Sequence, residues 1–228
     1  MIKVLSLCGH DDDSIVAIGG TLRKIADAGG EVNIVFYGNG NEGYADIKNQ
    51  AKIVALRQEE IKRSFAILGV KNHECFNYGD FAITANEETY KLAIGAIRRY
   101  KPDVIFTHYW KEYFQHRDTA RLVTDAWWQA GWRASLAQGE PWAAGKLYYF
   151  EVIHLIEQPT HIVDISDTYE AKVAAWKAFA SQDEFLDQMM VQMESKARFY
   201  GSLIGAKYGE ALKLSAYLPQ AINDIKEL

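Results

Sequence analysis

Several features are scarce in this chain of 228 residues, and each scarcity excludes a class of protein. It has only two cysteines, Cys8 and Cys75, and both fall in strand-like runs, which favours two buried thiols in a reducing compartment over a disulfide framework. No apolar run approaches the roughly 20 residues of a membrane span. The formal net charge of −5 provides no general attraction for nucleic acid or an anionic membrane, so we expect neither as a partner.

The remaining composition is that of an ordinary globular protein, with 49% hydrophobic and 24% charged residues. The first residues, MIKVLSL, run straight into a strand-like segment, so we expect no signal peptide and a cytoplasmic location. The length suits a single domain spanning residues 1–228. Within it we expect a core over about 1–165 and a helical C-terminal extension over about 166–228.

Strand-like and helical patterns alternate along the chain. This alternation predicts an α/β fold, with a Rossmann-like, open and mostly parallel sheet flanked by helices. The tail after Gly205 is weakly patterned. The expected strands are 2–8, 32–37, 74–77, 103–108, 147–153 and 161–165, and the expected helices are 14–28, 48–68, 87–100, 116–132, 167–181 and 184–204.

A histidine and three aspartates, His10 and residues 11–13, follow the first predicted strand. Ligands of open α/β sheets bind beyond the carboxyl ends of the strands, where this segment and the one after residue 108 should meet. The three-residue spacing lets His10 and Asp13 point at one spot, and both are zinc ligand types. The aspartates could equally cap a helix. The candidates for a third ligand are His73, His108, His116, His154 and His161.

A nucleotide-binding function is a weaker alternative. The glycine-rich stretch GNGNEGY at 38–44 lacks the lysine and hydroxyl residue of a P-loop. The segment GHDDD lacks the glycine spacing of a dinucleotide fingerprint, and its three acids would repel a pyrophosphate. We therefore interpret residues 38–44 as a rim of a substrate pocket.

HDDDS at residues 10–14 is followed by AIGGTL at residues 17–22. This pair is similar to the HPDDE…GGTL signature of the PIG-L/LmbE family of zinc-dependent de-N-acetylases, and four further motifs resemble that family in the same order. The others are an Arg-x-x-Glu helix ending in Leu-Gly-Val, a KPDVIFTH strand, a segment like the one after the family's HPDH motif, and an IVDIS…SQ segment. The five stretches occupy residues 10–22, 54–70, 101–108, 115–126 and 162–182.

The resemblance implies a Rossmann-like fold and one zinc ion, or another divalent transition metal, held by His10, Asp13 and His116. Asp12 would be the general base. Zinc lowers the pKa of its bound water to about 7, and it polarises the amide carbonyl. Asp12 would take the proton of the attacking water and return it to the leaving amine.

The third ligand depends on the alignment chosen. Taking YFQH at 113–116 for HPDH keeps His116 as the ligand, whereas the other register would put Thr119 there. In the chosen register Tyr113 replaces the family's first histidine, and Gln115 replaces its aspartate. A tyrosine can donate to an oxyanion but is a poor proton shuttle at neutral pH. We expect His108, at the end of a strand, to line the site and to be a catalytic group beside Tyr113.

Two further departures are Asp11, which stands at the family's proline, and Ser14, at its glutamate. Asp11 could compete with Asp13 for the metal, although the helical spacing and the family register favour Asp13. Its role stays open.

Two residues are candidates for substrate binding. Arg57 matches the family's Arg-x-x-Glu arginine, and a fixed guanidinium suits substrate hydroxyls or phosphate. The alternative is a surface pair with Glu59 or Glu60. Asp80, in YGDF, resembles a family loop residue, or is simply a turn residue.

The resemblance predicts a hydrolase that removes an N-acyl group, expected to be acetyl, from a small N-acetylated amino sugar or glycoconjugate. The alternative is a metal- and sugar-binding relative with impaired catalysis, since Tyr113 and Gln115 replace the family's His and Asp. Surplus aromatic residues and the helical C-terminal region suggest a homo-oligomer. The exact substrate does not follow from the sequence.

Overall fold

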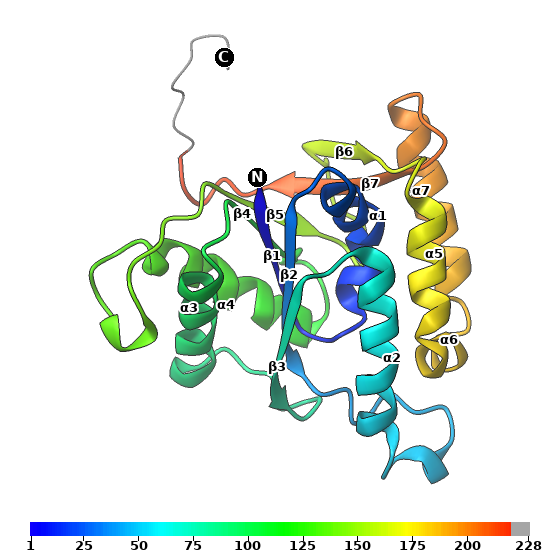
Figure 1. Cartoon of the computed structure of the whole chain (residues 1–228), viewed down its shortest axis with the longest axis horizontal. Helices are drawn as coiled ribbons and strands as arrows, with labels where there is room; N and C mark the ends of the chain where they lie inside the picture. Colours follow the sequence, from blue (N-terminus) through cyan, green and yellow to red (C-terminus); the bar gives the residue numbers. More distant parts are fainter. Residues whose placement is uncertain (220–228) are drawn as a thin grey trace.

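A computed structural model describes residues 1–219 of the chain. These residues form a seven-stranded sheet in the order β3-β2-β1-β4-β5-β7-β6 (Figure 1). The first five strands in this order are parallel, and β7 runs antiparallel to both β5 and β6. The predicted α/β fold with a mostly parallel sheet is confirmed. The strands are β1 (Lys3–Cys8), β2 (Glu31–Gly38), β3 (Asn72–Tyr78), β4 (Val104–His108), β5 (Lys146–Phe150), β6 (His161–Asp164) and β7 (Gly209–Leu214).

Helices cover both faces of the sheet (Figure 1). On one face lie α3 (Glu87–Tyr100) and α4 (Phe114–Ala130). The other face carries α1 (Asp13–Asp27), α2 (Ile53–Leu68), α5 (Tyr169–Ala178), α6 (Ala180–Phe185) and α7 (Met189–Leu203). Short 3-10 helices occupy Ile47–Asn49 and Leu136–Gln138.

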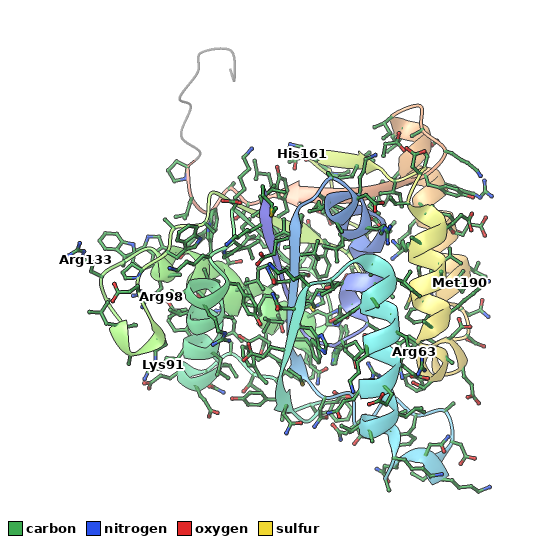
Figure 2. All side chains as sticks on the ribbon, viewed as in Figure 1. Arg63, Lys91, Arg98, Arg133, His161 and Met190 are labelled. Atoms are coloured by element: carbon green, nitrogen blue, oxygen red, sulfur yellow. The ribbon has the colours of Figure 1, made fainter. Side chains whose placement is uncertain are left out.

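The central strands are buried on both faces, which explains their continuous apolar runs. In β1, Leu5 and Leu7 belong to the core on the α3–α4 side, whereas Val4 and Cys8 belong to the core on the α1–α2–α5 side. Side chains fill the space between the sheet and both helical layers (Figure 2). Cys8 is buried as predicted, but Cys75 is only partly buried because β3 is an edge strand.

The C-terminal part of the chain differs most from the prediction. The two helices expected at 167–181 and 184–204 are three, α5, α6 and α7. The weakly patterned tail contains β7, which joins β5 to β6. No strand was predicted there because β7 is stabilised by its pairing with distant strands. The helix expected from residue 48 begins only at Ile53. None of the helices in residues 1–219 combines the length and apolar character of a membrane span.

Helix α1 has a kink within the AIGGTL segment. The backbone of Ile18 leaves the helical region, with φ −132° and ψ 21°. The next turn therefore has free N–H groups, as at any helix start. The N–H groups of Gly20 and Thr21 donate to the two carboxylate oxygens of Glu210 in β7, at 3.0 and 2.7 Å.

Lys172 of α5 completes this arrangement. Its Nζ lies 2.6 Å from Glu210 Oε1 and donates to the carbonyl of Ala17 at 3.4 Å. The lysine and the glutamate, both buried, thus bind opposite sides of the kink. A Cβ on Gly20 would lie 2.8 Å from the side chain of Ile165, so this position requires glycine. The first turn of α1, with Asp13, lies before the kink and follows the end of β1.

Candidate active site

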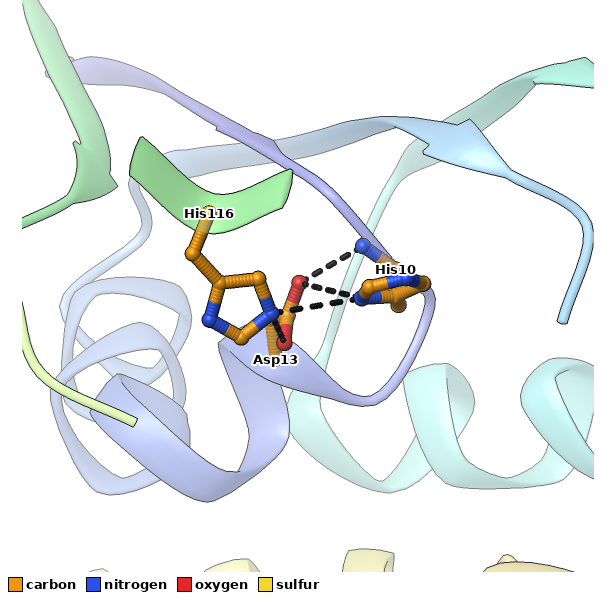
Figure 3. A group of neighbouring side chains, drawn as sticks. All are labelled: His10, Asp13 and His116. Atoms are coloured by element: carbon orange, nitrogen blue, oxygen red, sulfur yellow. Dashed lines mark hydrogen bonds and ion pairs between the residues drawn. The ribbon is translucent and has the colours of Figure 1, made fainter. Parts of the chain in front are cut away.

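Two segments more than 90 positions apart meet at the carboxyl end of the sheet. His10 and Asp13 follow β1, and His116 lies in the first turn of α4, just after the neighbouring strand β4. His10 Nδ1 lies 3.3 Å from His116 Nε2 and 3.6 Å from Asp13 Oδ2 (Figure 3). His116 Nε2 lies 3.1 Å from Asp13 Oδ1. The structure thus brings together the three predicted ligands.

The donor set fits a tetrahedral metal ion. Zinc binds imidazole and carboxylate atoms at about 2.0–2.1 Å, so tetrahedral ligand atoms lie about 3.3–3.4 Å apart. The two imidazole nitrogens lie 3.3 Å apart, which matches this value, and each of them lies 3.1–3.6 Å from one of the two Asp13 carboxylate oxygens. Burial would raise the pKa of Asp13, but the surrounding histidines hold it well below its usual range. Burial lowers the pKa of His116, but Asp13 outweighs this effect and raises it to about 9. The carboxylate is therefore arranged to meet positive charge.

Side chains just before α4 and in its first turn hold both histidines. His10 Nε2 lies 2.9 Å from Gln115 Oε1, so a proton on Nε2 leaves Nδ1 free for the metal. Glu112 Oε2 lies 3.5 Å from His116 Nδ1. The other oxygen of Glu112 accepts backbone N–H groups from residues 152–154 at 2.7–3.1 Å. Such partners orient ligands and raise their basicity.

Glu112 was not among the residues predicted from the sequence. Its signal was the spacing Glu-x-x-x-His, four residues before His116. That spacing is common on any helix, and Glu112 lies outside the compared motifs. Its role depends on the 152–154 loop, whose position only the fold determines.

We expect Glu112→Gln to lower the metal affinity about 10- to 100-fold, because His116 loses its carboxylate partner. The amide oxygen can still accept N–H groups from residues 152–154, so the melting temperature should change little. Glu112→Ala should lower both quantities. Competition with a chromophoric chelator measures the affinity, and Glu157→Gln, at an exposed ion pair, is the control. Wild-type affinity in both Glu112 variants would contradict this role.

Asp11 binds Arg57. The guanidinium is buried, and it makes two hydrogen bonds to the Asp11 carboxylate, one of them from Nε at 3.0 Å. The other interaction of Arg57 Nη2 is with Asp12 Oδ2, at 3.4 Å. Arg57 is therefore no surface partner of Glu59 or Glu60, and Glu60 instead accepts from the backbone and side chain of Ser181. Asp11 is engaged by arginine and does not line the cavity beside the predicted ligands.

The position of His108 differs from the prediction. We expected it to line the site, but it is completely buried and lies behind Asp13. Its Nε2 accepts the Gly9 N–H at 2.9 Å and lies 3.0 Å from Asp13 Oδ2, while its ring stacks on His116. Burial lowers its pKa to about 4. His108 therefore does not line this cavity, and it contacts Gly9, Asp13 and His116 instead.

The other predicted residues line one cavity of about 280 Å³. Burial raises the pKa of Asp12 to about 6, although Arg57 opposes the shift. Burial also raises the pKa of Tyr113, so its hydroxyl stays protonated. Asp80 accepts the N–H groups of Gly40 and Glu42, which fastens the glycine-rich loop to the rim. The polar side chains of its lining are His10, Asp12, Asp13, Glu42, Arg57, Asp80, Tyr113, Gln115, His116 and Gln182; the apolar ones are Val16, Phe81, Val152, Ile153, Phe185, Leu186 and Met189.

Comparison with known proteins identifies the family. The sequence model described as "PIG-L: GlcNAc-PI de-N-acetylase" matches residues 5–127, which include the whole His10–Asp13–His116 group. The chain belongs to the PIG-L family. This PIG-L protein is 30% identical over 222 residues to the diacetylchitobiose deacetylase of Thermococcus kodakarensis, covering 92% of this chain and 82% of that protein.

A solved structure agrees with this assignment. The N,N'-diacetylchitobiose deacetylase from Pyrococcus horikoshii, complexed with an inhibitor, superimposes with a TM-score of 0.86 at 27% identity, covering 99% of this chain and 88% of that chain. A 4-oxalmesaconate hydratase from Pseudomonas putida is 24% identical over 236 residues, covering 92% of this chain and 88% of that protein. Relatives of this PIG-L protein thus include deacetylases and a hydratase.

Proposed function

We propose that this PIG-L protein is a zinc-dependent hydrolase that removes an N-acyl group, acetyl in the simplest case, from an amino sugar or glycoconjugate. One observation carries the proposal: Asp12 lines the same cavity as the buried His10–Asp13–His116 group. Two imidazoles and one carboxylate form the ligand type of catalytic zinc sites, which keep a further position open. The similarity to diacetylchitobiose deacetylases supports an N-acetylated sugar as the substrate.

Each side chain around the cavity has a separate role in amide hydrolysis. Zinc, when bound, supplies a water that ionises near neutral pH and polarises the carbonyl. Asp12 accepts a proton from the attacking water and passes it to the amide nitrogen as the C–N bond breaks, which yields a carboxylate and an amine. Arg57, held by Asp11, keeps Asp12 in place. The protonated Tyr113 hydroxyl donates to the oxygen that becomes negative.

The charge of the cavity argues against hydratase chemistry on a polycarboxylate. Four carboxylates line it, from Asp12, Asp13, Glu42 and Asp80. Arg57, which also lines it, is already paired with Asp11. A substrate with several carboxylates would meet repulsion from Asp12, Glu42 and Asp80, whereas a neutral N-acetylated sugar would not.

Metal analysis and amine release together test the proposal. We expect about one zinc per chain, and primary amine from at least one of several N-acetylglucosamine derivatives. His116→Ala should lose both, whereas His161→Ala, outside the site, should lose neither. Zinc without amine release from any substrate would favour the alternative of a binding protein with impaired catalysis. A wild-type protein that binds no zinc would overturn the metal site.

A further inference from the structure

Phe81 has a backbone conformation that its side chain does not favour. It lies in the loop between β3 and α3, with φ +69°. The N–H of Ala82 donates to the carbonyl of Gly79, so Phe81 occupies the third position of a turn where a positive φ is normally met by glycine or asparagine. For a bulky residue this conformation is a true outlier, because the Cβ approaches the following carbonyl oxygen.

Packing does not explain this conformation. The side chain of Phe81 is 69% exposed, so burial does not repay the backbone strain. The loop is nevertheless firmly held: Asp80 accepts two N–H groups from the glycine-rich loop and donates its own N–H to Asn41, and Ile83 is fully buried. An aromatic ring is thus held in solvent at the mouth of the cavity. Strain of this kind clusters at ligand-binding positions.

Three more large side chains are exposed around the same cavity. Tyr113 precedes α4, Ile153 follows β5, and Phe185 ends α6; their exposed fractions are 38%, 53% and 41%. Single exposed apolar residues are normal, but four from separate elements at one cavity indicate a binding surface. Four further apolar side chains line the same cavity: Val16, Val152 and Met189 are buried, and Leu186 is partly buried.

We propose that Phe81, Tyr113, Ile153 and Phe185 bind an apolar group attached to the N-acylated sugar, and that Phe81 determines this specificity. The inference rests on the proposed function. The polar side chains of the cavity bind the reacting sugar and its amide, and the apolar group lies against the exposed aromatic rings. The substrate is then a conjugate with a flat apolar substituent. That substituent is either the aglycone or the acyl group, and both present the same chemistry to Phe81.

Two substrate pairs and one variant test the proposal. The first pair is the methyl and phenyl glycosides of N-acetylglucosamine; the second is N-acetyl- and N-phenylacetylglucosamine. In at least one pair we expect the phenyl member to have a kcat/KM about tenfold or more higher in the wild-type enzyme. Phe81→Gly should reduce that ratio to about one, chiefly through KM, without lowering the melting temperature, because glycine accepts the positive φ.

A matched control separates binding from backbone strain. Lys101 also has a positive φ, +49°, at the exposed end of α3. Lys101→Gly relieves comparable strain away from the cavity and should leave the ratio unchanged. Equal rates within both pairs for the wild type, or an unchanged ratio in Phe81→Gly, would overturn the proposal.

Direct binding separates this inference from the proposed function. Calorimetry on zinc-loaded protein measures the affinity for the phenyl glycoside and, in the second pair, for N-phenylacetylglucosamine. If the wild type releases no amine from any of the four substrates, the deacetylase function fails. Phe81→Gly should still weaken the binding of at least one of these two phenyl compounds about tenfold. If the wild type and Phe81→Gly bound each compound with equal affinity, the apolar subsite alone would be overturned.

Discussion

Replacing Asp12 with asparagine should lower kcat about 10²- to 10⁴-fold without removing zinc from the protein. The amide has the shape of the carboxylate but cannot accept the proton of the attacking water. Metal retention is expected because the ligand group consists of His10, Asp13 and His116, with Asp12 outside it. Steady-state amine release gives kcat, and metal analysis of the same preparations gives the zinc content.

The neighbouring carboxylate provides the control for this prediction. Asp11→Asn changes a side chain one position away that binds Arg57 and does not line the cavity. We expect it to lower kcat less than tenfold, since Arg57 keeps a hydrogen-bond acceptor. If Asp12→Asn kept more than a tenth of the wild-type kcat, Asp12 would not be the base. If it lost zinc, Asp12 would belong to the metal ligands.

The sheet centre was predictable because its signal is local. Residues 2–8 and 32–37 are continuous apolar runs, and such runs are typical of strands covered on both faces. β7 has no such signal. Its sequence, GEALKL, includes Glu210, which is buried only because the kinked α1 and Lys172 come to it from distant parts of the chain. Glu210 has a partner 190 residues away, and a pattern of neighbouring residues in the sequence cannot reveal such a contact.

The residues of the site likewise divide into those with a local sequence pattern and those that depend on distant contacts. Sequence motifs located the three side chains that could hold a metal ion, His10, Asp13 and His116, because these residues lie in short ordered stretches. The supporting residues escaped prediction. Asp11 was left without a role, Glu112 was not considered, and His108 was placed on the wall of the pocket. Each of these roles depends on which side chain stands opposite, and that depends on the packing of loops around the sheet.

The buried ion pair at the kink should be the most sensitive point for stability. Glu210→Ala leaves Lys172 charged and buried without its ion-pair partner. It also removes the acceptor of the N–H groups of Gly20 and Thr21. Removing one member of a buried pair costs about 3–5 kcal/mol of unfolding free energy. Urea denaturation measures this loss. Glu87→Ala, at an exposed ion pair on α3, should leave the urea midpoint unchanged.

A double variant tests whether the loss comes from the unpaired charge. Lys172→Met with Glu210→Gln removes both charges, and the glutamine oxygen still accepts one N–H of the kink. We expect the double variant to be more stable than Glu210→Ala, because isosteric replacement of a whole pair is often close to neutral. Because Asp13 lies in the turn of α1 that precedes this kink, we also expect the single variant to bind zinc more weakly. A loss below about 1 kcal/mol in Glu210→Ala, within the range of ordinary substitutions, would show that the kink holds without this carboxylate.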